Sequence, residues 1–245
     1  MSIEQSLNRV RERIAEAALR VGRLPDDVAL VAVSKTFPAE AVLEALAAGQ
    51  QDFGENRVEE ALAKKTQVSL ALGLLLARWH LIGHVQSRKA KDAVGEFELI
   101  HSIDSYKLAE VFSRRAMALA VPPLNRVLLE CNVSGEASKE GFDLANWQTD
   151  RAKFEAFAQS VAGILALPQI QVCGLMTIAP IVEQAELARP VFASLRALRD
   201  VLRERFPIQT ENLTQLSMGM SDDFEVAIAE GSTLVRVGRA IFGGR

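Results

Sequence analysis

The sequence predicts an α/β fold, a single-domain TIM (β/α)8 barrel with an extra N-terminal helix. Two observations predict this fold. Eight short apolar runs suited to buried parallel strands recur along the chain, and a segment of helical period lies between each run and the next. Eight alternating units favour a closed barrel over an open sheet. Because no repeat, low-complexity tract or linker interrupts the alternation, we expect residues 1–245 to form one domain.

The first expected element is an amphipathic helix over residues 2–21. Ile3, Leu7 and Val10 stand at helical spacing with charges between them, and Gly22 followed by Pro25 ends the helix. The apolar runs that follow have the length of strands and cover residues 29–33, 51–54, 79–83, 99–103, 126–133, 172–178, 215–219 and 234–238. The helices between them are expected over residues 39–48, 57–72, 87–95, 106–120, 151–165, 183–206 and 222–230.

Composition limits the classes of partner. The formal net charge of -3 gives no general attraction to nucleic acid or to an anionic membrane, so we expect a small-molecule partner. Cys131 and Cys173 occur singly within apolar runs, which suits a reducing cytosol and offers neither a disulfide framework nor a zinc motif. The polar N-terminus resembles no signal peptide, and no apolar run is long enough to span a bilayer. We therefore expect a soluble cytoplasmic protein.

Lys35 is the first candidate site residue. It follows the apolar run 28–34, which is typical of a buried parallel strand. In a barrel of this kind the C-terminal ends of the strands carry the chemistry, and a lysine held there among apolar walls is a candidate Schiff-base former. The alternative is a lysine that extends from a strand end into water.

Two segments near the C-terminus indicate a phosphate site. Residues 216–225 and 234–243 follow or contain the seventh and eighth strands, where this fold recurrently binds phosphate through backbone N–H groups. Ser217 and Gly219 would form one side of the site, and Gly238 with the N–H of Arg239 the other. Each segment alone is equally consistent with a helix cap and a turn. With Lys35 on the neighbouring first strand, they describe a bound phosphorylated aldehyde, which is pyridoxal 5'-phosphate.

These residues also carry a family resemblance. The segments 33–36, 53–56, 79–86, 174–177 and 217–243 fall in the order found in the pyridoxal phosphate homeostasis proteins (the YggS/PROSC-like family), which the chain resembles from about Lys35 to its end. The resemblance implies a barrel like the N-terminal domain of alanine racemase and a monomer. It also implies a cofactor carrier that affects amino-acid and keto-acid balance, has no established turnover, and delivers the cofactor to apo enzymes.

The resemblance assigns roles by position. Lys35 corresponds to the lysine that forms the aldimine, and Arg236 to the partner of the pyridine nitrogen. The phosphate cradle corresponds to Ser217, Gly219, Gly238 and the backbone of Arg239, and the ring and pocket wall to Asn56, His80 and Met176. The chain departs from the family at Ser87-Arg88, where an Asn-Lys pair is common, and at Arg239, where a small residue is common.

Several features argue against catalysis. A fixed arginine at the pyridine nitrogen opposes protonation of the ring and weakens the electron sink that carbanion chemistry needs. Racemases with this arginine add a tyrosine base from a second domain, which we do not expect here, and the single tyrosine, Tyr106, is expected on the surface. We therefore predict a protein that is not an enzyme. The alternatives are a low-activity racemase or lyase, and a barrel enzyme that forms a Schiff base with a sugar phosphate.

Two further groups of residues have features that can indicate function. His80 and His84 are four residues apart, but residues 79–83 are expected in a strand and no thiol or carboxylate completes a ligand set, so we predict no metal site. The insertion 134–149 is polar and glycine-punctuated, typical of a mobile loop beside the active site. Its Lys139 stands in a family-like position and is either a second amine or anion contact at the mouth, or a solvated loop lysine.

Overall fold

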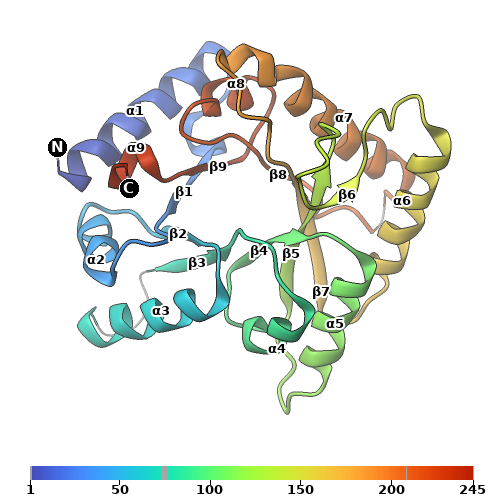
Figure 1. Ribbon diagram of the computed structural model, residues 1–245, viewed down its shortest axis with the longest axis horizontal. Helices are drawn as coiled ribbons and strands as arrows, with labels where there is room; N and C mark the ends of the chain where they lie inside the picture. The colour runs from blue at the N-terminus through green and yellow to red at the C-terminus, as the bar shows by residue number, and fades with distance from the viewer. Residues whose placement is uncertain (1, 73–76, 208, 245) are drawn as a thin grey trace.

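The structure, a computed structural model, describes residues 2–72, 77–207 and 209–244, and it confirms the predicted barrel (Figure 1). In chain order the barrel strands are β1 (Ala29–Val33), β2 (Asp52–Glu55), β3 (Arg78–Leu81), β4 (Leu99–Ile103), β5 (Asn125–Asn132), β7 (Ile170–Met176), β8 (Gln215–Ser217) and β9 (Leu234–Val237). They run in the order β4-β3-β2-β1-β9-β8-β7-β5, and the pairing of β4 with β5 closes the sheet. All neighbouring strands are parallel.

Helices surround the barrel on its outside (Figure 1). They are α1 (Ile3–Arg20), α2 (Ala39–Ala47), α3 (Val58–Leu72), α4 (Ala90–Ala93), α5 (Tyr106–Met117), α6 (Arg151–Leu165), α7 (Arg189–Arg205), α8 (Phe224–Ala229) and α9 (Arg239–Phe242), with 3-10 turns η1 (Pro25–Asp27), η2 (Ser87–Lys89) and η3 (Ala185–Ala188). Among the helices that the structure describes, none combines the length and hydropathy needed to cross a bilayer.

The extra N-terminal helix is confirmed. Ser2 caps the N-terminus of α1 in a capping box, in which its hydroxyl accepts from the Gln5 N–H and the Gln5 side chain accepts from the Ser2 N–H. The buried face of the helix carries Leu7, Val10 and Ile14. This face packs against α2, α8 and α9, so that the two ends of the chain lie close together (Figure 1).

Four local features differ from the predicted pattern. The predicted helix 87–95 is the turn η2 followed by the short α4, and the predicted helix 183–206 is η3 followed by α7. Pro190 stands in the first turn of α7, where its missing N–H costs no helical hydrogen bond. The insertion 134–149 contains the short strand β6 (Phe142–Asp143), which pairs with β5. The short α9 follows the last strand. Segments of two to four residues are too short to show a period.

The apolar core has two layers. Alternate strand residues face opposite sides of a barrel wall, and the outward set packs against the helices. The inward set forms a separate cluster in the barrel interior, made of Val31, Leu99, Leu128, Cys173, Met176 and Leu234. Polar residues at the other inward-facing positions of these strands fill the remainder of the interior. This filled interior places the candidate site at the strand ends.

Candidate functional site

Lys35 lies at the C-terminal end of the barrel, two residues after β1. It is half-buried. Strand β1 pairs directly with β9, with Ala32 opposite Val237, so Lys35 and Gly238 follow neighbouring strand ends. The predicted adjacency of the first and eighth strands is therefore confirmed, because the barrel is closed.

A buried ion pair fixes the backbone on the N-terminal side of Lys35. Lys64 Nζ, from α3, donates to the Ser34 carbonyl oxygen at 2.8 Å and to Glu55 Oε1 at 2.5 Å. The Ser34 hydroxyl donates to the same carboxylate oxygen at 2.7 Å. Glu55 is fully buried, and burial raises the pKa of its carboxyl against the opposing hydrogen bonds from Lys64 and Ser34. Helix α3 thus holds the strand end that presents Lys35.

A second contact from α3 fixes the other side of Lys35. Thr36 has a positive φ of 68°, a conformation that is strained for a β-branched residue. Its N–H donates to Glu60 Oε1 at 2.5 Å, and Glu60 also lies 3.3 Å from Lys64 Nζ. Side chains of one helix therefore hold both neighbours of Lys35, which restricts the directions its own side chain can take.

Arg236 is the buried cation of the barrel interior. It lies on β9, is 5% exposed, and donates from Nη1 to Ser217 Oγ at 2.6 Å and from Nη2 to the Thr177 carbonyl oxygen at 2.9 Å. Burial lowers its pKa to about 10, opposed by the carboxylates of Glu130 and Asp223. The guanidinium therefore stays charged at neutral pH. The structure brings together Arg236 and Ser217, two of the predicted site residues.

Glu130 lies on β5 within reach of the Arg236 charge. It is 6% exposed, and burial raises the pKa of its carboxyl to about 7, against the opposing charge of Arg236. Its Oε2 has no hydrogen-bond partner in the part of the chain that the structure describes. Gly141, at a φ of 105°, packs so closely on Glu130 that an added Cβ would lie 2.6 Å from the Glu130 carbonyl oxygen. The insertion after β5 therefore packs directly against Glu130.

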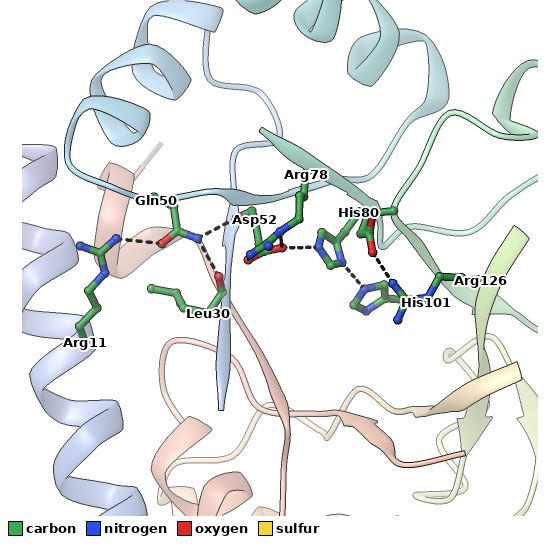
Figure 2. A network of polar contacts seen from close by, with 9 residues as sticks. Arg11, Leu30, Gln50, Asp52, Arg78, His80, His101 and Arg126 are labelled. Carbon is green, nitrogen blue, oxygen red and sulfur yellow. Dashed lines mark hydrogen bonds and ion pairs between the residues drawn. The ribbon is translucent and has the colours of Figure 1, made fainter. Parts of the chain in front are cut away.

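A row of hydrogen-bonded side chains runs through the barrel interior from Asp52, at the start of β2, to Arg236 on β9. We call Asp52, His80, His101, Ser217 and Arg236 the histidine column. His80 Nε2 lies 3.0 Å from Asp52 Oδ1, and His80 Nδ1 lies 2.9 Å from His101 Nε2 (Figure 2). His101 Nδ1 lies 2.9 Å from Ser217 Oγ. Both ring nitrogens of His80 are thus engaged inside the barrel, and a place for its ring on the pocket wall stays a prediction.

The two glycine-containing segments lie side by side, as adjacent strands require. The Arg236 N–H donates to the Gly219 carbonyl oxygen at 3.0 Å. Gly219 has a φ of 92°, and an added Cβ would lie 2.6 Å from the Ala227 Cβ, so only glycine fits this turn. Gly238 directly precedes α9, and its carbonyl oxygen accepts from the N–H groups of Ile241 and Phe242, each at 2.9 Å. The exposed Arg239 side chain pairs with Asp222 on the surface. The backbone of Arg239, rather than its side chain, is therefore the part that can face the barrel mouth.

The other two residues predicted for the pocket wall, Asn56 and Met176, differ in burial: Asn56 is half-buried and Met176 is fully buried. Asn56 directly follows β2, and the strand ends crowd here, because an added Cβ on Gly83 would lie 2.5 Å from the Asn56 carbonyl oxygen. Met176 ends β7 and is fully buried within the interior cluster. Their roles as wall residues stay predictions.

The other candidate residues lie around the mouth of the barrel or outside it. His84 pairs with Asp104 at 3.0 Å rather than with His80, and Glu140 completes a group whose ligand atoms lie within 4.8 Å of one another. Carboxylates therefore do approach His84, which the spacing of residues in the sequence did not indicate. Lys139 lies 3.8 Å from Glu136 within the insertion. The Tyr106 ring packs against Gly163 of α6 and is 39% exposed, as expected for a surface role.

Sequence patterns did not single out His101, Glu130 or Asp52. The alternation of side chains along a strand could have indicated two of them. His101 and Glu130 each stand two residues after an inward-facing leucine of the same strand, Leu99 and Leu128, and so face the barrel interior as well. Polar residues at inward positions of otherwise apolar strands are candidates for interior function, since burial without a partner is costly.

Comparison with known proteins agrees with this geometry. Residues 5–245 match the family model for the alanine racemase N-terminal domain. A protein from Aquifex aeolicus named pyridoxal phosphate homeostasis protein is 42% identical over 245 residues, which cover 100% of this chain and 99% of that relative.

Two solved structures extend the comparison. PipY of Synechococcus elongatus, solved with PLP bound, is 42% identical at a TM-score of 0.74, covering 94% of this chain and 100% of that one. A Clostridium difficile alanine racemase shares the fold at 14% identity and a TM-score of 0.66, covering 100% of this chain and 57% of that one. By sequence and by fold, the chain belongs to the pyridoxal phosphate homeostasis proteins, within the alanine racemase N-terminal domain family.

Proposed function

We propose that this protein binds pyridoxal 5'-phosphate at the mouth of its barrel and acts as a carrier that maintains the supply of the cofactor. The observation that carries the proposal is the pairing of β1 with β9, which places Lys35 beside the segment that holds Arg236 and Gly238. The Lys35 amine, the buried Arg236 guanidinium and the close-packed turn at Gly219 would then contact one ligand. The PLP-bound relative PipY, 42% identical, supports the same ligand class.

The residues fit the cofactor group by group. Bound pyridoxal 5'-phosphate supplies an aldehyde that condenses with amines and an electron-withdrawing ring. Lys35 would hold the aldehyde carbon, and Arg236 would donate to the pyridine nitrogen. The phosphate would lie between Ser217, Gly219, Gly238 and the Arg239 N–H, with Asn56, His80 and Met176 around the ring.

The charge on Arg236 supports a carrier rather than an enzyme. A guanidinium donates hydrogen bonds and does not accept them, and the pKa of about 10 keeps Arg236 protonated at neutral pH. It therefore opposes a proton on the pyridine nitrogen, and this weakens stabilisation of a carbanion. Tyr106 packs on α6, outside the barrel, rather than toward the mouth.

The second candidate, a slow racemase or lyase, has a physical basis in Glu130. A carboxyl group with a pKa near 7 beside Arg236 suits proton transfer at neutral pH. A Cα proton would have to be removed and returned at a measurable rate. The two functions therefore differ in hydrogen exchange at Cα.

The test combines transfer and exchange. The protein loaded with pyridoxal 5'-phosphate is mixed with an apo enzyme that requires the cofactor, and the activity regained is compared with that from the same amount of free cofactor. In parallel, amino acids are incubated with the loaded protein in D2O and Cα deuteration is followed by NMR. We expect transfer without Cα exchange. Exchange that disappears in Lys35→Ala would establish the enzyme instead, and failure to transfer would contradict the carrier role.

A further inference from the structure

Three side chains of the kinds that bind metal ions meet at the C-terminal ends of adjacent strands. His84 follows β3, Asp104 directly follows β4, and Glu140 lies in the insertion after β5. These strands are neighbours in the closed sheet, because β4 pairs with both β3 and β5 (Figure 1). One nitrogen or oxygen atom from each residue lies within 4.8 Å of those from the other two. We call His84, Asp104 and Glu140 the mouth triad.

The spacing of these atoms suits a small divalent cation. Zinc binds imidazole nitrogen and carboxylate oxygen at about 2.0–2.2 Å, so two ligand atoms of a tetrahedral zinc site lie about 3.4 Å apart. His84 Nδ1 and Asp104 Oδ2 are 3.0 Å apart and need to separate only slightly. Glu140 is exposed, and its carboxylate would have to approach by less than about 2 Å, which a change of rotamer achieves.

Two members of the mouth triad are held in place by hydrogen bonds to the ends of the strands. Asp104 Oδ1 accepts from the Ser105 hydroxyl at 2.8 Å, which leaves Oδ2 directed at His84. The carbonyl oxygen of Gly83, the residue before His84, accepts from the Ser102 hydroxyl of β4 at 2.7 Å. Outer partners of this kind orient the ligands of metal sites. The triad therefore combines two positioned ligands with a third on the insertion.

The carboxyl group of Glu130 provides a second, independent indication of a cation. It is 6% exposed, and its Oε2 has no hydrogen-bond partner among the described residues. Its side chain lies beside the segment that carries Glu140, since a Cβ added to Gly141 would lie 3.0 Å from Glu130 Cγ. The ionisable groups that act on this carboxyl include all three members of the mouth triad. A buried oxygen without a partner is costly, and a cation held by the triad would offset that cost.

We propose that the mouth triad binds one divalent transition-metal ion, with Zn²⁺ the best fit, and that Glu130 faces this ion from the barrel interior. The imidazole nitrogen favours Zn²⁺ over Mg²⁺ and Ca²⁺, which prefer oxygen ligands alone. Two carboxylates balance the charge of the ion, and three protein ligands leave a fourth position for water or for Glu130. The sequence did not predict this site, and the inference does not depend on the proposed binding of pyridoxal 5'-phosphate.

A bound ion would connect the insertion to the barrel, because only Glu140 comes from residues 134–149. Lys139, the residue before it, is the only lysine or arginine in that range, so trypsin can cleave the insertion only there. Cleavage requires the insertion to leave the ion. At a Zn²⁺ concentration ten times the Kd we therefore expect cleavage after Lys139 to slow by about tenfold in the parent and to be unchanged in Asp104→Asn.

The direct test measures Zn²⁺ bound per chain, by equilibrium dialysis and titration calorimetry. The untagged full chain is used without added cofactor, because pyridoxal 5'-phosphate can itself chelate Zn²⁺. Of the three histidines, His80 and His101 are buried in the histidine column, so His84 is the one imidazole open to solvent. We expect one Zn²⁺ per chain, an affinity at least about 100-fold weaker in His84→Ala, and no competition from excess Mg²⁺.

Asp104→Asn and Asp143→Asn form a matched pair of variants. Both remove one carboxylate charge, but Asp143 lies on β6 of the insertion, is exposed, and pairs with Lys153 instead of the mouth triad. Asp104→Asn should weaken Zn²⁺ binding by at least about 10-fold, whereas Asp143→Asn should match the parent. Circular dichroism checks that each variant is folded. Because His84 is 44% exposed, His84→Ala remains a valid test if Asp104→Asn is unstable.

Three results would overturn the site. They are the absence of saturable Zn²⁺ binding up to about 1 mM, equal affinities in the parent and His84→Ala, and an equal loss of affinity in Asp104→Asn and Asp143→Asn. The last would show a general attraction of cations to the acidic insertion. None of these results bears on the proposed function, which fails only if the cofactor itself is not bound or not transferred.

Discussion

Replacing Lys35 by alanine is expected to abolish covalent attachment of pyridoxal 5'-phosphate and to leave weak, phosphate-anchored binding. The amine is lost, whereas Arg236, Ser217 and the glycine turns keep their contacts. We expect the affinity to fall by about 100-fold, or roughly 2.7 kcal/mol. Borohydride reduction followed by mass spectrometry measures covalent attachment, and equilibrium dialysis measures the residual affinity.

Lys35→Arg is the matched control for charge. Arginine keeps a cation at the end of β1 but has no amine that can be deprotonated to attack an aldehyde. It should therefore lose covalent attachment as completely as Lys35→Ala. Lys139→Ala removes another lysine, on the insertion after β5, and should retain attachment at Lys35. Undiminished attachment in Lys35→Ala would move the site elsewhere, with Lys139 the first lysine to map.

Replacing Lys64 by methionine is expected to cost about 3–5 kcal/mol of unfolding free energy, because it leaves the fully buried Glu55 carboxylate without its cation. Methionine keeps the length and helix propensity of the side chain, so α3 itself should form normally. The loss also frees the Ser34 carbonyl oxygen next to Lys35. We therefore expect slower covalent attachment as well as a lower midpoint of urea denaturation.

Lys65→Met is the control on the same helix. Lys65 is the next residue along the chain, and its side chain is 33% exposed and paired with Glu96. A pair in contact with solvent contributes less than about 1 kcal/mol. Equal losses of stability in the two variants would show that the Lys64–Glu55 pair does not hold the strand end.

The barrel could be predicted because the sequence pattern that indicates it, a short apolar run followed by a helical segment, is local and recurs along the chain. Each strand is a short aliphatic run, and closure of eight such units forces β1 to pair with β9, so the proximity of Lys35 to the Gly238 segment followed from topology alone. Elements of two to four residues, β6 and α9, carry no period and were not predicted. The start of α7 was misplaced because residues 183–188 share its composition but form a turn.

The interior of the site could not be predicted in the same way. Contacts such as His101 with Ser217 join residues 116 positions apart and depend on strand tilt and register, which a sequence does not display. The contacts of Glu60 and Lys64 with Thr36 and Ser34, the two neighbours of Lys35, depend on which face of α3 meets the barrel. Charged residues in a helix usually indicate a solvated face, and Lys64 is an exception because Glu55 is buried beneath it.

The measurement that tests the central claim most directly is the absorption spectrum of the purified protein with pyridoxal 5'-phosphate, followed by borohydride reduction and peptide mapping. We expect a visible band that reduction removes, and a single modified peptide in which the cofactor is attached to Lys35. A protein that shows no band and no adduct, or an adduct on another lysine, would contradict the placement of the cofactor at the end of β1.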